Sequence, residues 1–393
     1  MSKLTIVILG LSITSSWGNG HATTYRGLVK ELARRGHDVT FLERDVPWYG
    51  GANRDMPNPP YGRTALYSDY ADLTERFAAP VRQADVVILG SYVPEGARVA
   101  RWMLDTATGI TAFYDIDTPI TVAKLNAGDE EYLSAAEVPR FDVYLSFAGG
   151  PLLERIRRDF GARQTELLYC SVDPELYYPE AAPIRWDLGY LGTYSLDRQP
   201  KLELLLLGPA RARPDARFVV AGPQYPEDLV WPANVERIEH LPPDAHRAFY
   251  NAQRFALNVT RAEMTANGWS PSVRLFEAAA CGVPLISDDW QGLDTIFAPG
   301  KEILIASSSQ EVTAMLADIP EERRREIGLA AQRRVQRSHT AAIRAQELEA
   351  FVHRLTAGAA SAAGVAAADS STSIASGERV QRLSQYPAKS LTS

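Results

Sequence analysis

Short apolar runs alternate with helix-forming segments along most of the chain, and this alternation constrains the fold more than any other feature. Strands that are apolar along their whole length are typical of a parallel sheet covered by helices on both faces. In the first half of the chain, strands are predicted over residues 4–11, 39–43, 85–90, 110–114, 141–147 and 166–170. Helices are predicted over residues 21–35, 95–106 and 151–159. The first half is therefore predicted to be a doubly wound α/β domain.

The same alternation begins again near residue 187. Strands are predicted over residues 187–191, 217–221, 235–240, 255–260, 283–287 and 302–306. Helices are predicted over residues 199–207, 244–251, 271–281, 309–318, 321–337 and 341–355. Two doubly wound domains in one chain are expected to face each other across a cleft at the carboxyl ends of their strands, where ligands bind.

The domain boundaries follow from changes in composition. Residues 173–183 contain three prolines and are predicted to be a stiff linker. The expected parts are therefore a Rossmann-like domain over residues 1–172, this linker, a second Rossmann-like domain over 184–340 and a helix over 341–355. Ala, Ser and Gly make up 21 of the last 38 residues, 356–393, which are predicted to be a disordered tail.

Composition excludes several classes of function. The net charge of −7 argues against a general nucleic-acid binder, and the arginines of residues 321–337 are interpreted as the solvated face of a helix. The sequence contains no apolar run of the roughly 18 residues that span a bilayer, which leaves only peripheral membrane contact open. Cys170 and Cys281 are the two cysteines, as expected of a reducing, cytoplasmic setting. No cluster of Cys and His has the spacing of zinc ligands, and no metal is expected.

The stretch SPSVRLFEAAACGVP, residues 270–284, carries the most specific chemical pattern in the chain. It predicts a helix with Pro271 in the first position and Ser270 as its cap. The start of a helix presents free backbone N–H groups and a positive dipole end, so this helix start, with Ser272, is a candidate phosphate site.

Two charged side chains follow on one face of this predicted helix. Arg274 and Glu277 are three residues apart, so they lie side by side. The guanidinium can pair with a diphosphate through two hydrogen bonds, and the carboxylate, one turn further along, can accept the hydroxyls of a ribose. The alternative is an ordinary ion pair on a surface helix.

This segment resembles the carboxyl-terminal domain of GT-B glycosyltransferases, and more closely the CgeB-like (spore-maturation type) group. Residues 170–179 (CSVDPELYYP) are similar to the group's crossover between domains, and residues 189–195 (GYLGTYS) to the first strand and loop of its donor domain. Residues 297–304 (FAPGKEIL) match a later segment, and the resemblance extends over about residues 1–350. It implies a glycosyltransferase of the GT-B fold that takes a nucleotide-diphosphate sugar as donor, without a metal or other cofactor, and an acceptor that is not identified.

One departure from the family concerns the donor sugar. Many retaining relatives carry two glutamates eight positions apart, of which Glu277 matches the second. The first falls on Trp269, which is not acidic. The resemblance therefore leaves open the stereochemistry and the donor sugar, and with them the choice among uridine, guanosine and thymidine.

Further donor-binding candidates lie in loops that follow predicted strands. Gly192 permits close approach of the backbone to a phosphate, Thr193 offers a hydroxyl, and Arg198 is a candidate cation. Gly222 and Pro223 follow a strand where the edge of a nucleobase is expected. For Arg198 and for the Gly222–Pro223 pair, a purely structural role in a loop or turn is an equal alternative.

The loop after the first strand contains Gly18 and Gly20 but lacks the third glycine of a dinucleotide-binding loop, because Thr23 stands in its place. It resembles instead the glycine-containing loop of GT-B enzymes that faces the donor phosphates. His21, at the start of the next helix, is a candidate contact to donor or acceptor, with a helix-capping role as the alternative.

Asp115 and Asp117 end the predicted strand 110–114, so they are expected to face the cleft. Asp117 is the preferred candidate for a base that deprotonates the acceptor hydroxyl, and a turn-capping role is the alternative. The predicted catalytic set is therefore Asp117, His21 and Arg274. Two other functions stay open on the same fold: a nucleotide-sugar epimerase or hydrolase, and a non-catalytic sugar-nucleotide binder.

Overall fold

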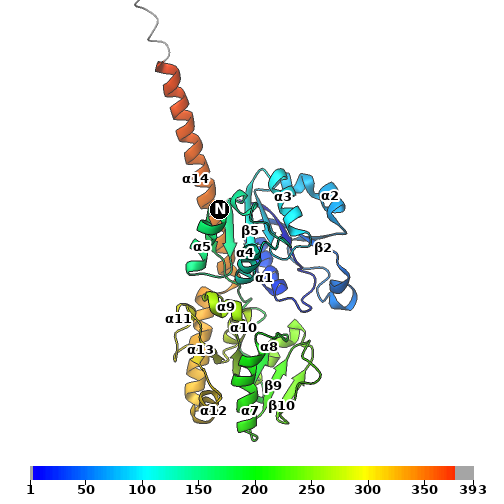
Figure 1. Ribbon diagram of the computed structural model, residues 1–393, viewed down its shortest axis with the longest axis vertical. Coiled ribbons are helices and arrows are strands. Elements are labelled where there is room, and N and C mark those ends of the chain that lie inside the picture. The colour runs from blue at the N-terminus through cyan, green and yellow to red at the C-terminus, as the bar shows by residue number, and fades with distance from the viewer. Residues whose placement is uncertain (1–2, 377–393) are drawn as a thin grey trace, which may run out of the picture. The chain divides into compact units, whose positions relative to one another are not determined.

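The computed structural model describes residues 3–376, and residues up to Leu348 form one compact unit that contains two parallel sheets (Figure 1). The first sheet has seven strands in the order β3 (Arg63–Tyr67), β2 (Asp38–Arg44), β1 (Thr5–Gly10), β4 (Val86–Gly90), β5 (Ile110–Asp115), β6 (Val143–Ser146) and β7 (Thr165–Leu167). Its helices are α1 (His21–Arg34), α2 (Tyr70–Gln83), α3 (Gly96–Thr106), α4 (Thr118–Ala127) and α5 (Pro151–Phe160).

The second sheet repeats this arrangement with six parallel strands. Their order is β10 (Val235–Ile238), β9 (Phe218–Ala221), β8 (Trp186–Leu191), β11 (Gln253–Asn258), β12 (Leu285–Ser287) and β13 (Leu304–Ile305). The helices of this half include α6 (Gln199–Leu202), α7 (Gly208–Ala212), α8 (Pro243–Asn251), α9 (Ala262–Asn267), α10 (Val273–Ala280), α11 (Leu293–Ile296), α12 (Ser309–Asp318) and α13 (Glu321–Ser338). In both sheets the strand order reverses direction beside the first strand of that half. The prediction of two doubly wound domains is thereby confirmed.

The central strands of both sheets are buried because their side chains are apolar on both faces. β4 is buried at all five positions, and β9 at all four. Apolar side chains of α10, including Leu275 and Phe276, fill the space between β11, β12 and α13. This packing fixes α10, which carries the charged pair singled out in the sequence, against the sheet.

The chain crosses between the two halves twice, and the two crossings are hydrogen-bonded to each other. The first passes through Val172 into the linker, and the second follows α13. Val172 donates its N–H to the carbonyl of His339 at 3.1 Å, and Ala341 donates its N–H to the carbonyl of Val172 at 2.9 Å. These bonds and the parallel bridge between Val172 and Thr340 form a strap between the halves.

The carboxyl-terminal helix is longer than predicted. α14 covers Ala341–Ser376 and not 341–355, so the first part of the predicted tail is helical. Alanine, the strongest helix former, is frequent in residues 356–376, and proline is absent there. Residues 377–393, the rest of the predicted tail, lie outside the described residues. Among the helices that are described, none is both long enough and apolar enough to cross a membrane.

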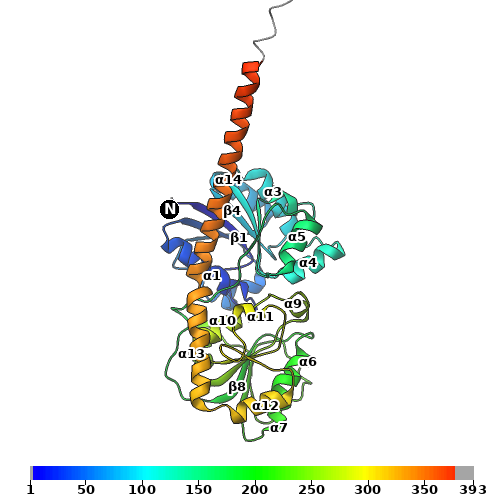
Figure 2. The ribbon, with the colours of Figure 1, turned by 90° about the vertical axis from the view of Figure 1, so that its left-hand side faces the viewer.

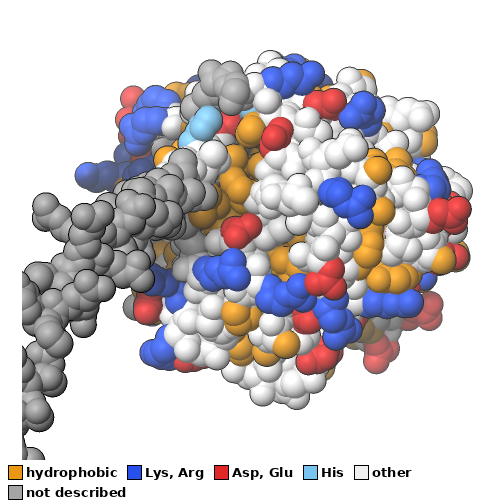
Figure 3. Space-filling model, turned by 90° about the horizontal axis from the view of Figure 1, so that it is seen from above, with side chains coloured by type: hydrophobic (Ala, Val, Ile, Leu, Met, Phe, Trp, Pro, Cys, Tyr) orange, Lys and Arg blue, Asp and Glu red, His pale blue; other side chains and the backbone are white. Residues whose placement is uncertain are grey.

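The surface of the molecule carries both signs of charge. Lys and Arg side chains are interspersed with Asp and Glu side chains on the face shown in Figure 3. On α13 the arginines alternate with the buried residues Ile327, Ala331 and Val335. α13 runs along the second half in Figure 2 and presents its arginines as the solvated side of an amphipathic helix.

Candidate functional site

A pocket of about 230 Å³ lies at the carboxyl ends of β1 and β8, between the two sheets. Loops from both halves form its walls, as expected at the point where the strand order of each sheet reverses. Its lining residues are Ser16, Gly18, Asn19, Gly20, Thr23, Leu191, Gly192, Thr193, Arg198, Gly222, Pro223, His240, Leu241, Pro243, His246, Tyr250, Ser272, Val273, Arg274 and Glu277.

The helix α10 points its amino-terminal end at this pocket. The predicted start at Pro271 with Ser270 as cap is wrong: the cap residue is Ser272, and the helix begins at Val273. The Ser272 backbone is extended, and the Ser270 hydroxyl donates instead to the carbonyl of Gly268 at 2.8 Å. The shift leaves the first N–H groups of α10 beside the pocket, where an anion is stabilised by the helix dipole.

Arg274 is held in one orientation by three groups. Its Nε donates to the carbonyl of Leu191, and its Nη1 donates to Oδ1 of Asn258 at 3.0 Å. Its guanidinium also lies over the ring of Tyr190, 4.7 Å from the centroid. Arg274 is buried except at the pocket, where in the described part of the chain its Nη2 makes no hydrogen bond. The charge is thus positioned before any ligand arrives.

Glu277 lines the pocket one turn further along α10. It is buried, and its Oε2 accepts a hydrogen bond from the hydroxyl of Tyr250 at 3.0 Å. Within the residues that the structure describes, Glu277 has no ion-pair partner, and Tyr177 joins Tyr250 as a second tyrosine that interacts with the buried carboxylate. A ligand that donates hydroxyl groups to Glu277 would offset the remaining cost of burying the charge.

Two glycines bring the second-half loops close together. A Cβ on Gly222 would lie 2.1 Å from the carbonyl oxygen of Gly192, and one on Gly192 would lie 2.8 Å from Nη2 of Arg274. Gly222 also has a φ of +142°, a conformation that other residues rarely adopt. A side chain at Gly222 would push against the backbone of Gly192, and one at Gly192 would push against Tyr190 and Arg274, so both glycines shape the wall of the pocket beside Arg274.

Arg198 and Lys201 follow the β8 loop but differ in their partners. Arg198 lines the pocket and donates from Nη2 to the carbonyl of Thr193 at 2.8 Å. Lys201 is paired with Asp288 and donates to the hydroxyl of Thr265 at 2.9 Å. Arg198 is therefore the cation that remains available to a ligand, while Lys201 fixes the end of β12.

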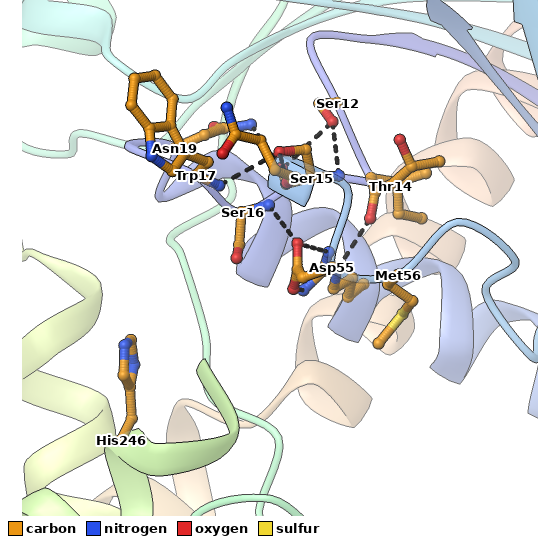
Figure 4. A network of polar contacts seen from close by, with 12 residues as sticks. Ser12, Thr14, Ser15, Ser16, Trp17, Asn19, Asp55, Met56 and His246 are labelled. Carbon is orange, nitrogen blue, oxygen red and sulfur yellow. Dashed lines mark hydrogen bonds and ion pairs between the residues drawn. The ribbon is translucent and has the colours of Figure 1, made fainter. Parts of the chain in front are cut away.

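In the first half, a buried carboxylate organises the loop between β1 and α1. Glu43 accepts hydrogen bonds from the N–H groups of Ile13 and Thr14 and from the hydroxyls of Ser12 and Thr14, all within 3.0 Å. Figure 4 shows that the loop then turns past Ser16, whose N–H donates to Asp55, towards Asn19 and α1, with His246 of α8 on the opposite wall. Gly18 and Gly20 lie at the tip of this loop, with open space around them.

His21 and Asp117 do not line the pocket but meet in a second group of polar residues beside it. Asp117 accepts a hydrogen bond from the hydroxyl of Tyr92 at 3.0 Å and lies 3.6 Å from Nη1 of Arg261. The ring of His21 packs edge-on against Tyr92. Arg261, which belongs to the second half, also lies 3.8 Å from Asp197 of the same half, measured from its Nε to Oδ2. We call these five residues the Asp117 cluster.

Burial shifts the pKa values of this cluster. It raises the pKa of Asp117, an effect that Arg261 and the Tyr92 hydroxyl oppose. It lowers the pKa of His21 to about 4, so His21 is neutral at pH 7. Both residues were predicted as catalytic candidates, and the structure places them together at the carboxyl ends of β1 and β5.

Asp115 has a different environment, although it is only two residues from Asp117. It is fully buried, and its carboxylate accepts hydrogen bonds from the hydroxyls of Thr121 and Tyr144. Burial raises the pKa of Asp115 to about 6. Since Asp115 is enclosed by its own partners, it stabilises the turn into α4. In residues 3–376, no three His, Cys, Asp or Glu side chains converge as a metal site.

The structure thus brings together all ten predicted donor-binding residues around one pocket: Gly18, Gly20, Gly192, Thr193, Arg198, Gly222, Pro223, Ser272, Arg274 and Glu277. Their individual roles stay predictions. Sequence reasoning missed Tyr250, which holds Glu277, and Asn258, which links Arg274 to Ser272. Each is a polar residue near the end of a largely apolar strand or helix, and this pattern is too common in proteins to single out a functional residue.

Trp269 stands where many retaining relatives have their upstream glutamate, and it packs between the two halves. Its φ is +43°. A Cβ on Gly150 of the first half or on Gly292 of the second would lie 2.4 Å from its indole. Its carbonyl accepts the N–H of Gly149 at 3.0 Å. The residue therefore acts as a spacer between the domains in place of an acidic group.

Comparison with known proteins bears on this site. Residues 198–350 match the model of a family described as "Glycosyl transferase-like". The second half of this chain carries a glycosyl transferase-like domain. The match includes Arg198, Arg274 and Glu277, which line the second-half wall of the pocket. No match was found among curated proteins.

Solved structures show the same two-domain fold over nearly the whole chain. Sucrose-phosphate synthase from Thermosynechococcus elongatus is 16% identical, with a TM-score of 0.65 over 90% of this chain and 100% of its own. HepE from Anabaena, solved with UDP and glucose, is 12% identical, with a TM-score of 0.66 over 89% and 99%. An α-glucosyltransferase in complex with UDP and DNA is 11% identical, with a TM-score of 0.67 over 90% and 100%. The family match agrees with the predicted glycosyltransferase domain in the second half, and the shared fold confirms the predicted architecture of two doubly wound domains.

Proposed function

We propose that the chain transfers a sugar from a UDP-sugar to an acceptor hydroxyl. The observation that supports this best is the convergence of the start of α10, Arg274 and Glu277 on one pocket between two Rossmann-like domains. These groups suit a phosphate, a diphosphate and a ribose in that order along the helix. Uridine is chosen among the nucleosides because HepE and the α-glucosyltransferase were solved with UDP.

In this proposal, the leaving group is UDP, and negative charge grows on its diphosphate as the bond to the sugar breaks. Arg274, Arg198 and the first N–H groups of α10 all lie along the pocket that would hold this charge. Because Leu191 and Asn258 already hold Arg274 in place, no reorganisation is needed when the charge appears. This positioning supports a reaction without a metal ion.

Asp117 is proposed as the base that accepts the proton of the acceptor hydroxyl. Its Oδ1 is buried without a partner, and burial raises its pKa towards the range in which a carboxylate acts as an efficient base. His21 is neutral and lies one residue beyond Gly20 of the pocket, so we propose that it contacts the donor or acceptor by hydrogen bonding.

We further propose kinship with the CgeB-like group and a cytoplasmic setting. Segments 170–179, 189–195 and 297–304 support the first proposal by their order and spacing. Two buried free thiols support the second: Cys170 donates to the carbonyl of Pro271 at 3.3 Å, and neither Cys170 nor Cys281 forms a disulfide.

Calorimetry with UDP, GDP and dTDP tests the donor assignment. UDP should bind most tightly, and Arg274→Ala should weaken its binding. Incubation with UDP-sugars then separates the alternatives, because an epimerase or hydrolase converts donor alone, a non-catalytic binder converts nothing, and a transferase needs an acceptor. If none of the three nucleotides binds, the donor pocket is assigned wrongly.

A further inference from the structure

Unpartnered polar atoms gather beside the donor pocket. In the described part of the chain, the buried side-chain atoms without a hydrogen bond include His21 Nδ1, Asp117 Oδ1, Arg198 Nε, Gln199 Oε1, Arg261 Nε and Glu263 Oε2. A buried polar atom without a partner costs about 1–3 kcal/mol, so six of them in one region would be a large penalty if they stayed unmatched. Such a concentration marks a polar site whose partners are ordered water or the polar groups of a ligand.

These atoms belong to residues of both halves that are close to one another. Asp117 touches Tyr92 and Arg261, and Arg261 reaches Asp197. Glu263 follows Arg261 in the first turn of α9, and α9 packs against α4, which begins directly after Asp117. The charge of Glu263 also contributes to the raised pKa of Asp117, after the larger effect of burial.

The position of the Asp117 cluster beside the pocket indicates which part of a bound donor it would contact. Arg198 lines the pocket and also acts electrostatically on Asp117. Gly20 lines the pocket, and His21 is the next residue. With the nucleoside at Glu277 and the diphosphate at Arg274 and Arg198, the group that follows the diphosphate falls on the Asp117 cluster and Glu263. In a nucleotide sugar, that group is the sugar ring.

The charges of the subsite favour one class of sugar. Asp117, Asp197 and Glu263 supply three carboxylates, whereas Arg198 and Arg261 supply two guanidiniums, so the negative charges are in excess. His21 does not compensate, because burial keeps it neutral. Hydroxyl groups can donate to the carboxylates and accept from the arginines, while a further carboxylate on the ligand would be repelled.

We propose that Arg261 and Glu263, beside the base Asp117, form the subsite for the transferred sugar, with Glu263 selecting a neutral, hydroxyl-rich hexose over a sugar acid. This inference rests on the proposed function, because it assumes the donor's orientation in the pocket.

Calorimetry on the parent and two variants tests the proposal. The probes are UDP, UDP-glucose, UDP-galactose, UDP-N-acetylglucosamine and UDP-glucuronic acid. In the parent, at least one neutral donor should bind tenfold or more tighter than UDP, and UDP-glucuronic acid should gain nothing over UDP. Glu263→Gln should leave UDP binding unchanged and weaken the preferred neutral donor by about tenfold or more, the effect of one hydrogen bond to a charged group. The matched control is Glu322→Gln, the same change at an exposed position on α13, which should alter neither affinity.

The outcomes separate the inference from the function on which it rests. Equal weakening of UDP and UDP-sugar by Glu263→Gln, or no weakening of either, overturns the sugar subsite and leaves the nucleotide pocket intact. Tightest binding of UDP-glucuronic acid overturns the charge argument. Failure of UDP to bind the parent overturns both proposals. If Glu263→Gln melts well below the parent, Arg261→Lys replaces it, with the same expected loss confined to the UDP-sugar.

Discussion

Replacing Glu277 should weaken nucleotide binding without weakening the fold. Its Oε2 accepts a hydrogen bond from the Tyr250 hydroxyl at 3.0 Å, and its carboxylate lines the pocket, where a ribose hydroxyl can donate to it as well. One hydrogen bond to a charged group contributes about 1.5–3 kcal/mol. At about 1.4 kcal/mol per tenfold change, Glu277→Ala should raise the Kd for UDP by about 10- to 100-fold.

Two further variants separate the charge from the shape. Glu277→Gln keeps the side-chain volume and the contact to Tyr250 but loses the charge, so it should lie between the parent and Glu277→Ala. Tyr250→Phe removes the partner and keeps the carboxylate, so its effect on UDP should be smaller than that of Glu277→Ala. Glu322→Gln is again the exposed control, with unchanged affinity.

Isothermal calorimetry with UDP and thermal melting of the ligand-free protein are the paired measurements. A buried carboxylate without an ion-pair partner does not stabilise the fold, so Glu277→Gln should melt at or above the parent temperature. Parental affinity for UDP in Glu277→Ala would refute the ribose assignment. A loss of affinity that is matched by a fall in melting temperature would show instead that Glu277 is a structural residue.

Four other predictions follow from the same structure. Arg274→Ala should lower the turnover number by about 10²–10³, and Arg274→Lys should recover only part of it, because a lysine cannot reach both Leu191 and Asn258; a change confined to KM would contradict the leaving-group role. Gly222→Ala should abolish UDP binding in a protein that still folds, since its Cβ would lie 2.1 Å from the Gly192 carbonyl, and calorimetry with melting measures both. Donor turnover should survive EDTA, and full loss with rescue by Mn²⁺ would implicate Asp115 and Asp117 as ligands. Burial lowers the pKa of His339 from 6.5 to about 3. As the pH falls from 7 to 4, the unfolded chain therefore takes up a proton at this residue that the folded protein does not, and the free energy of unfolding should decline. If a His339→Gln variant shows the same decline in denaturant titrations, His339 is not its cause.

Much of the fold was predictable because the buried strands are apolar along their whole length. The runs at 4–11 and 85–90 became β1 and β4, each shifted by a residue or so at its ends. β3 was not predicted because it is an edge strand with only Tyr67 buried, so its sequence RTALY lacks an apolar run. α4 was not predicted because its apolar residues do not recur with a clear helical period.

The site was predictable where one segment carries it and not where distant segments meet. Arg274 and Glu277 lie on one helix, so their spacing alone places them on one face. By contrast, the contact of Asp117 with Arg261 joins residues of different sheets, and the support of Arg274 by Asn258 depends on how α10 packs beside β11. No local sequence pattern specifies such contacts, because they depend on how segments distant in the sequence pack against each other.

The strap formed by Val172 and residues 339–341 limits how the two halves can move. A single flexible connection would allow rotation about any axis, whereas two hydrogen-bonded crossings side by side act as a hinge with one preferred axis. Rotation about such an axis would separate the halves most at positions far from the strap and least beside it. A single proteolytic cut within residues 173–183 would separate the covalent chain into two fragments, but the second crossing would still hold the first half through hydrogen bonds such as those of Ala341 to Val172 and Arg344 to Cys170. The domains should therefore stay paired after such a cut and keep one direction of closure.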